Sequence, residues 1–185
     1  MINRQNDLKN LCLASLLTAL LMLFSMLCLP IGTGKITLQF LGVLLIGGLL
    51  PKSYALLSVC TYLFLGGLGL PVFAGFSGGI GVLLGATGGF LWGFLPAVLL
   101  FCRLYRKKRS FLFTALSAAA SLALCYLCGC LWYLFYLPQE QALSALALFV
   151  LPYLLPDALK ILLAALLLPH LTHLLQKNGF TAGAE

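Results

Sequence analysis

Two ionisable residues lie within an otherwise apolar stretch near the carboxyl end of the chain. Asp157 and Lys160 are three positions apart, so on a helix they share a face and can pair. An ionisable group at the centre of a bilayer costs about 2.5 to 3.5 kcal/mol on insertion scales, and such groups are functional candidates by default. Pro152 and Pro156 are expected to interrupt this helix and free backbone groups for a ligand. The pair is therefore predicted to bind a polar ligand; the alternative is an ion pair that only tolerates its burial.

Glycine is concentrated in the middle of the chain. Ten glycines lie between Gly66 and Gly89, in a segment that includes S-G-G at 77–79 and T-G-G at 87–89. This density is costly in a regular helix, and bare backbone is tolerated in a membrane only where it is buried in protein or lines a cavity. The segment is therefore predicted to be a long, partly inserted loop whose backbone a ligand approaches. Close packing alone would require the same glycines, and a phosphate-binding loop is excluded because its lysine is missing.

Cysteines and histidines suggest two further kinds of site. Cys125 and Cys128 form a C-x-x-C, as in membrane thiol oxidoreductases, but such an enzyme needs a second cysteine pair in an outer loop, and the predicted outer loops contain none. Inert helix cysteines are the favoured interpretation. His170 and His173 are three apart without a nearby Asp, Glu or Cys, which favours interfacial histidines over a metal site. We therefore predict no catalytic residue, no metal and no cofactor.

Composition decides the class of protein that must position these residues. The chain has 185 residues, of which 62% are hydrophobic and 8% are charged. Soluble domains carry about 25% charged residues, so a cytosolic enzyme and a nucleic-acid-binding module are excluded. A spanning helix needs roughly 20 apolar residues, and the chain has enough for about six. The prediction is an all-α polytopic membrane protein with six transmembrane helices, forming a single membrane domain over residues 1–185.

The expected helices follow the apolar stretches and the breaks between them. They cover residues 11–29, 36–50, 54–65, 90–104, 111–136 and 142–168. A turn at Pro30 separates the first two, and the glycine-rich loop joins the third to the fourth.

Orientation is predicted from the basic residues. With six spans, nine of them fall on one side, including five between Arg103 and Arg109. The positive-inside rule then places both termini in the cytoplasm, which makes the chain a multi-pass protein of a cytoplasmic membrane. The net charge of +7 is assigned to contacts with lipid headgroups of the bilayer, not to nucleic acid.

The first predicted helix carries two pairs of small residues at a spacing of four. Ala14 pairs with Thr18, and Ser15 pairs with Ala19. Pairs of this kind let another helix approach closely. That helix could belong to a partner protein or to this chain, and the spacing alone does not distinguish the two.

Four sequence blocks carry a family resemblance. They are I-T-L-Q-F-L-G at 36–42, G-G-L-G-L-P-V-F-A-G at 66–75, L-G-A-T-G-G-F at 84–90 and P-D-A-L-K at 156–160. In this order they resemble the signatures of the BioY family, the biotin-binding S components of energy-coupling factor (ECF) transporters. One departure is Ala86, where the family usually has proline, and it removes no ligand group. The resemblance implies a prokaryotic six-helix membrane protein that captures biotin from outside and catalyses no reaction.

The resemblance also implies partners and site residues. Transport would be driven by a transmembrane coupling subunit with two ATPase subunits, and the chain itself has no G-x-x-x-x-G-K-[ST] motif. A buried carboxylate can accept hydrogen bonds from the ureido N–H groups of biotin, and an ammonium can bind its ureido carbonyl or its carboxylate. The predicted substrate-binding residues are Asp157, Lys160, Phe73, Ser77, Thr87, Gly88, Gly89, Gln39 and Trp92, with Phe90 as a further aromatic contact. The predicted docking residues are Ala14, Ser15, Thr18 and Ala19. An S component for another vitamin is the alternative within this class.

Overall fold

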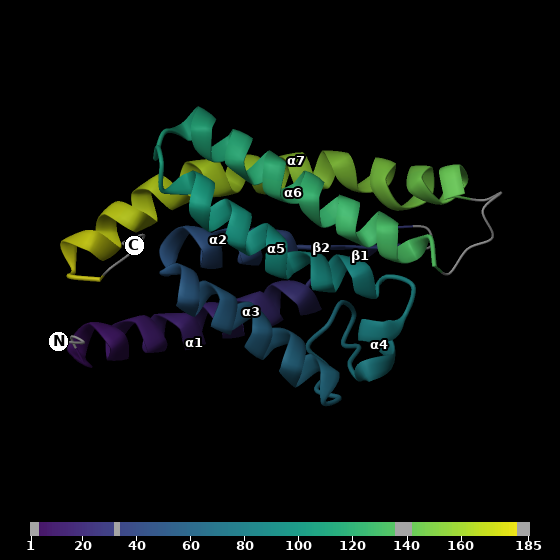
Figure 1. Cartoon of the computed structure of the whole chain (residues 1–185), viewed down its shortest axis with the longest axis horizontal. Coiled ribbons are helices and arrows are strands. Elements are labelled where there is room, and N and C mark those ends of the chain that lie inside the picture. The colour runs from purple at the N-terminus through teal and green to yellow at the C-terminus, as the bar shows by residue number, and fades with distance from the viewer. Residues whose placement is uncertain (1–3, 32–33, 136–141, 181–185) are drawn as a thin grey trace.

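Helices dominate the structure, a computed structural model that describes residues 4–31, 34–135 and 142–180. Within these ranges seven helices and one hairpin follow one another (Figure 1). The helices are α1 (Arg4–Met26), α2 (Gln39–Leu49), α3 (Lys52–Gly67), α4 (Ile80–Leu84), α5 (Gly88–Tyr105), α6 (Phe111–Tyr133) and α7 (Ala142–Lys177), and the strands are β1 (Cys28–Ile31) and β2 (Gly34–Thr37). The predicted helical class is confirmed, whereas the predicted count of six is not, because α4 was not expected.

Four helices in the described part of the chain are long and apolar enough to cross a membrane. Their spans are Gln5–Met26, Gly88–Tyr105, Phe111–Tyr133 and Pro152–Lys177. Helices α2 and α3 are shorter than these four. Helix α2 has 11 residues and α3 has 16, which correspond to lengths of roughly 16 and 24 Å. Both lengths fall below the thickness of a hydrocarbon core, about 30 Å.

Helix α2 lies at the centre of the helical packing. All its residues are buried, and it contacts α1, α3, α5 and α7. Glycine permits close approach on two sides, since a Cβ at Gly42 would come within 2.9 Å of Leu21 in α1, and one at Gly47 within 3.0 Å of Phe101 in α5. A helix that is apolar all round is stable only when it is surrounded in this way.

Three segments differ from the sequence-based expectation. The turn expected between the first two helices is a hairpin, in which β1 and β2 pair antiparallel. The segment from Gly66 to Gly89 is not one continuous loop, because it contains the end of α3, the whole of α4 and the start of α5. Helix α7 continues through Pro152 and Pro156 instead of breaking there. In apolar surroundings a helix satisfies most backbone groups, and this outweighs the hydrogen bond that each proline removes.

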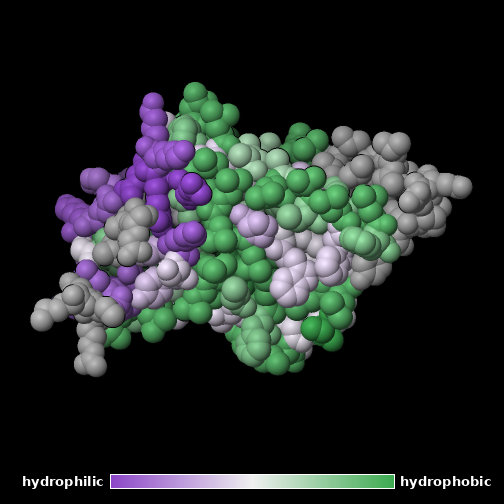
Figure 2. Space-filling model, in the orientation of Figure 1, coloured by the Kyte–Doolittle hydropathy of each residue, from purple (hydrophilic) through white to green (hydrophobic). Residues whose placement is uncertain are grey.

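Polar and apolar surfaces separate along the molecule. Figure 2 shows hydrophilic residues gathered at one end, and Figure 1 shows that α1 begins, α7 ends and α5 turns into α6 at that same end. Apolar side chains predominate among the other coloured residues on this face, and α1 exposes Leu8, Leu16 and Leu23. Exposed leucines along a helix that is long enough to span are typical of lipid-facing surfaces.

Candidate ligand-binding site

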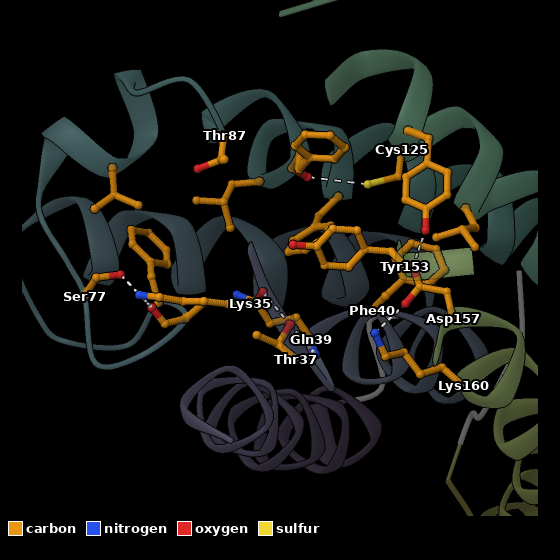
Figure 3. A pocket seen from close by; sticks show the side chains of 18 residues that line it. Lys35, Thr37, Gln39, Phe40, Ser77, Thr87, Cys125, Tyr153, Asp157 and Lys160 are labelled. Carbon is orange, nitrogen blue, oxygen red and sulfur yellow. Dashed lines mark hydrogen bonds and ion pairs between the residues drawn. The ribbon is translucent and has the colours of Figure 1, made fainter. Parts of the chain in front are cut away.

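A cavity of about 350 Å³ lies between the hairpin, α2 and helices α5, α6 and α7. Small-molecule sites typically measure about 300 to 1,000 Å³, so the cavity suits a compact ligand. It is lined by Lys35, Thr37, Gln39, Phe40, Phe73, Ala74, Ser77, Val82, Thr87, Phe90, Leu91, Phe94, Leu122, Cys125, Tyr126, Tyr153, Asp157 and Lys160 (Figure 3).

A buried ion pair from α7 forms one side of the cavity. Lys160 Nζ donates to Asp157 Oδ1, and the side chains are 6% exposed. The phenol of Tyr126 in α6 donates to the other carboxylate oxygen, Oδ2. Asp157 therefore accepts hydrogen bonds from side chains of two helices. Asp157 and Lys160 both line the cavity. Because the two side chains are already shielded from water, a ligand that hydrogen-bonds to them displaces little of their hydration, and charged hydrogen bonds in such surroundings are strong.

The opposite side of the cavity is formed by the hairpin and the segment that follows α3 (Figure 3). Lys35 in β2 extends its Nζ to the carbonyl oxygen of Ala74, at 3.1 Å. The hydroxyl of Ser77 donates to the same oxygen, at 3.0 Å. Gly75 lies directly under the ammonium, since a Cβ there would come within 2.6 Å of Lys35 Nζ. Its φ of +71° is in the region that favours glycine, so the backbone conformation requires this residue.

Aromatic rings form the apolar wall between these two sides. Phe73 is 1% exposed and packs edge to face on Tyr62, with ring centroids 5.3 Å apart. Phe90 meets Tyr126 in the same edge-to-face arrangement, at 6.4 Å. Phe73 is held in place by its backbone N–H, which donates to the carbonyl of Ser77 at 2.9 Å. The wall can therefore receive a flat or cyclic apolar group.

A buried polar network supports the floor of the cavity. The amide nitrogen of Gln39 donates to Ser25 Oγ at 2.7 Å and to the Tyr62 hydroxyl at 2.6 Å. Thr37 Oγ1 donates to Gln39 Oε1 at 2.9 Å. The network joins α1, the start of α2 and α3 below the ligand space. Gln39 lines the cavity, but both its N–H donors are occupied, so its first role is to position these elements.

The structure brings most of the predicted substrate-binding residues together. Those that line the cavity are Asp157, Lys160, Phe73, Ser77, Thr87 and Gln39, together with Phe90. Gly88, Gly89 and Trp92 are outside its lining. A side chain at Gly88 would collide with the carbonyl of Leu83, and one at Gly89 would collide with Trp132, so these glycines serve close packing. The indole of Trp92 donates to the carbonyl of Leu83 at 3.1 Å and so fastens α4 to α5.

The cysteines and histidines occupy packing and surface positions. Cys125 is buried, forms no disulfide and also lines the cavity, where its thiol donates to the carbonyl of Phe90 at 3.5 Å; a Cβ at Gly93 of α5 would lie 3.2 Å from both Cys125 Sγ and Cys128 Cβ. The C-x-x-C motif therefore belongs to the contact between α5 and α6. His170 and His173 are exposed on α7.

The four predicted docking residues separate into two faces of α1. Ala14 is 3% exposed and Thr18 is 6% exposed; Ser58 of α3 donates to the carbonyl of Ala14 at 3.4 Å. These two residues face the interior, which corrects the expectation that they meet a partner. Ser15 and Ala19 are exposed and leave a small-residue surface on the outside of α1.

Sequence reasoning missed several residues of the cavity. Lys35 and Tyr126 line the cavity but are not among the predicted binding residues. Tyr153 lay only three residues before Pro156 and was not considered. A usable signal was present for Lys35, because it directly precedes the I-T-L-Q block that carries the resemblance.

Comparison with known proteins places this arrangement in a family. The model of the BioY family matches residues 1–177. The chain is 36% identical over 160 residues to a biotin transporter BioY from Thermotoga maritima, covering 86% of this chain and 94% of that protein. It is also 36% identical over 152 residues to a probable biotin transporter BioY from Pyrococcus horikoshii, covering 82% of this chain and 89% of that one.

A solved structure agrees with these sequence matches. The S-component for biotin from an ECF-type ABC transporter has a similar fold, with a TM-score of 0.81 and 26% sequence identity. The similarity covers 94% of this chain and 95% of the other. Since the sequence and fold similarities both extend over nearly the whole chain, the chain belongs to the BioY family.

Proposed function

We propose that this chain is the biotin-binding subunit of a transporter that takes up biotin across the cytoplasmic membrane. Family membership supports this function, and the cavity with its buried ion pair is the observation that carries it. Biotin combines a ureido group, an apolar thioether ring and a carboxylate. The cavity offers polar groups on two sides and aromatic rings between them, so each part of biotin meets a suitable surface.

The ion pair suits the neutral ureido group. Asp157 can accept the ureido N–H groups, while Lys160 and the Tyr126 hydroxyl can donate to the ureido carbonyl after small movements. The thioether ring then packs against Phe73 and Phe90.

Binding is tested by calorimetry on the purified protein. We expect biotin to bind tightly and thiamine and riboflavin not to bind, because neither carries a ureido group on a small apolar bicycle. Binding of another vitamin in place of biotin would identify a different S component, and binding of none of the three would contradict the proposal.

Transport is proposed to depend on partner subunits. The chain has no phosphate-binding motif for ATP, so uphill uptake needs an external source of free energy. A transmembrane coupling subunit with two ATPase subunits would supply it, and the exposed small residues Ser15 and Ala19 are the proposed contact surface. Vesicles that contain the chain with these partners should accumulate biotin only when ATP is supplied.

The thiol oxidoreductase alternative is not supported. The similar proteins of the BioY family are named as biotin transporters, and Cys125 and Cys128 of α6 pack against Gly93 of α5.

A further inference from the structure

The charges that line the cavity do not balance. Among the residues that the structure describes, Lys35, Lys160 and Asp157 are the charged ones in its lining, which gives two positive charges and one negative. Asp157 and Lys160 neutralise each other. Within the described part of the chain, Lys35 forms no ion pair, and its hydrogen bond is to a neutral carbonyl. Among the described residues the cavity therefore keeps one uncompensated positive charge, on the side of Ser77 and away from Asp157 (Figure 3).

The position of this charge is set by the backbone around it. Lys35 follows Gly34 in β2, and its side chain crosses Gly75 to reach the carbonyl of Ala74. An ammonium has three N–H donors, so this single bond leaves donors for a ligand. Figure 3 shows Lys35 and Ser77 on one side of the cavity and Asp157 with Lys160 on the other.

We propose that Lys35 binds the carboxylate of biotin and thereby fixes the direction in which biotin lies in the cavity. This inference rests on the proposed function and adds to it the residue that recognises the anionic end. Biotin has its ureido ring at one end and its carboxylate at the other. The cavity has Asp157 on one side, for the ureido ring, and Lys35 on the other, for the carboxylate. Lys160 is the poorer partner for the carboxylate, because the ligand would then bring a second negative charge next to Asp157.

The test compares biotin with biotinol, in which an uncharged alcohol replaces the carboxylate. The variants are Lys35→Met, Lys35→Arg and, as a matched control, Lys108→Met in the exposed turn before α6. Lys35→Met should weaken biotin binding about tenfold and leave biotinol binding nearly unchanged, because one charged hydrogen bond is lost. Lys35→Arg should keep most of the biotin affinity, and Lys108→Met should bind both ligands as the unmodified protein does.

Ionic strength gives a second readout. Added salt should weaken biotin binding to the unmodified protein and have a much smaller effect on Lys35→Met, because the screened attraction involves Lys35. Equal losses for biotin and biotinol in Lys35→Met, or unchanged biotin affinity, would overturn the role of Lys35 and leave the proposed function intact. Failure of the unmodified protein to bind biotin would instead contradict the proposed function itself.

Discussion

Asp157 is the residue on which the chemistry of the site converges. The residue is buried, and its carboxylate accepts from Lys160 of its own helix and from Tyr126 of α6. Such a group needs its donors, because an unpaired buried charge is strongly destabilising. A ligand that enters the cavity can replace part of these contacts only if it provides N–H donors of its own.

We predict that Asp157→Asn, Lys160→Met and the double variant Asp157→Asn/Lys160→Met all weaken biotin binding. Losing one partner of a desolvated charged hydrogen bond costs about 2 to 5 kcal/mol of binding free energy. Calorimetry with biotin should show this loss. Because each single change leaves one buried charge unpaired, stability is compared in the double variant, whose melting temperature without ligand should stay near that of the unmodified protein. Asp7→Asn is the matched control, since Asp7 lies in α1 away from the cavity and accepts from Tyr54 at 3.0 Å. A large drop in melting temperature with unchanged affinity would assign the pair to structure alone.

The sequence predicted the residues of the site that are chemically unusual for their surroundings. Asp157 and Lys160 stood out because charge is rare in an apolar helix, and the cavity contains both. Tyr126 was missed because nothing along the chain indicates that α6 faces the same space as α7, whereas Lys35 could have been suspected from its place directly before the I-T-L-Q block. Gly88 and Gly89 were assigned to the ligand because spacing cannot separate a backbone that a ligand approaches from one that another helix approaches.

At the level of elements, the packing of α5 on α6 is controlled by small residues. Gly89 and Gly93 lie four apart on α5, and a Cβ at Gly93 would come within 3.0 Å of the carbonyl of Cys125. In return, Gly129 of α6 makes room for the ring of Phe90. Close helix contacts of this kind are a main source of stability in membranes, where lipid is as apolar as the side chains.

We predict that Gly93→Val destabilises the protein by about 1 to 3 kcal/mol, the usual cost of overpacking a well-packed contact. The melting temperature in detergent should fall. The matched control is Gly81→Ala in α4, because a Cβ at Gly81 meets nothing within 4 Å and the melting temperature should not fall. Equal melting temperatures for the two variants would show that the contact between α5 and α6 tolerates a larger side chain, and would contradict the prediction.

Helices were easier to predict than the elements between them. Long apolar stretches indicated α1, α5 and α6 because each has room for many turns between breaks. The hairpin was missed because each strand has only four residues and its flanks are apolar, so no alternation of polar and apolar residues marks it. Helix α4 was missed because Gly79, Gly81 and Gly85 suggested a loop, although only five residues needed to be helical.

For the whole molecule, the separation of polar and apolar surface suggests an orientation. The hydrophilic end carries the start of α1, the end of α7 and the basic turn between α5 and α6 (Figures 1 and 2). We predict that this end faces the cytoplasm, because basic residues are retained on that side. A green fluorescent protein fused after Glu185 should fluoresce, and alkaline phosphatase fused there should be inactive. A fusion after Ser110, in the basic turn, should behave in the same way, and opposite results at the two positions would contradict the orientation.

The proposed energy coupling requires a surface on which a partner subunit acts, and we propose that the outer face of α1 is this surface. Ser15 and Ala19 are exposed one turn apart, and the Ser15 hydroxyl donates to the carbonyl of Leu11 at 3.0 Å, so this surface is small and needs no polar partner. On the opposite face, Ala14 and Thr18 are buried against the rest of the chain, which makes α1 a rigid support.

We predict that Ser15→Trp and Ala19→Trp abolish ATP-dependent biotin uptake and co-purification with the coupling subunit, because a large ring prevents close helix contact. Biotin affinity should remain near that of the unmodified protein, since neither residue lines the cavity. Ala120→Trp is the matched control, an exposed small residue on α6 that should permit uptake. If both α1 variants still co-purify with the coupling subunit and Ala120→Trp does not, the docking surface lies on α6 instead.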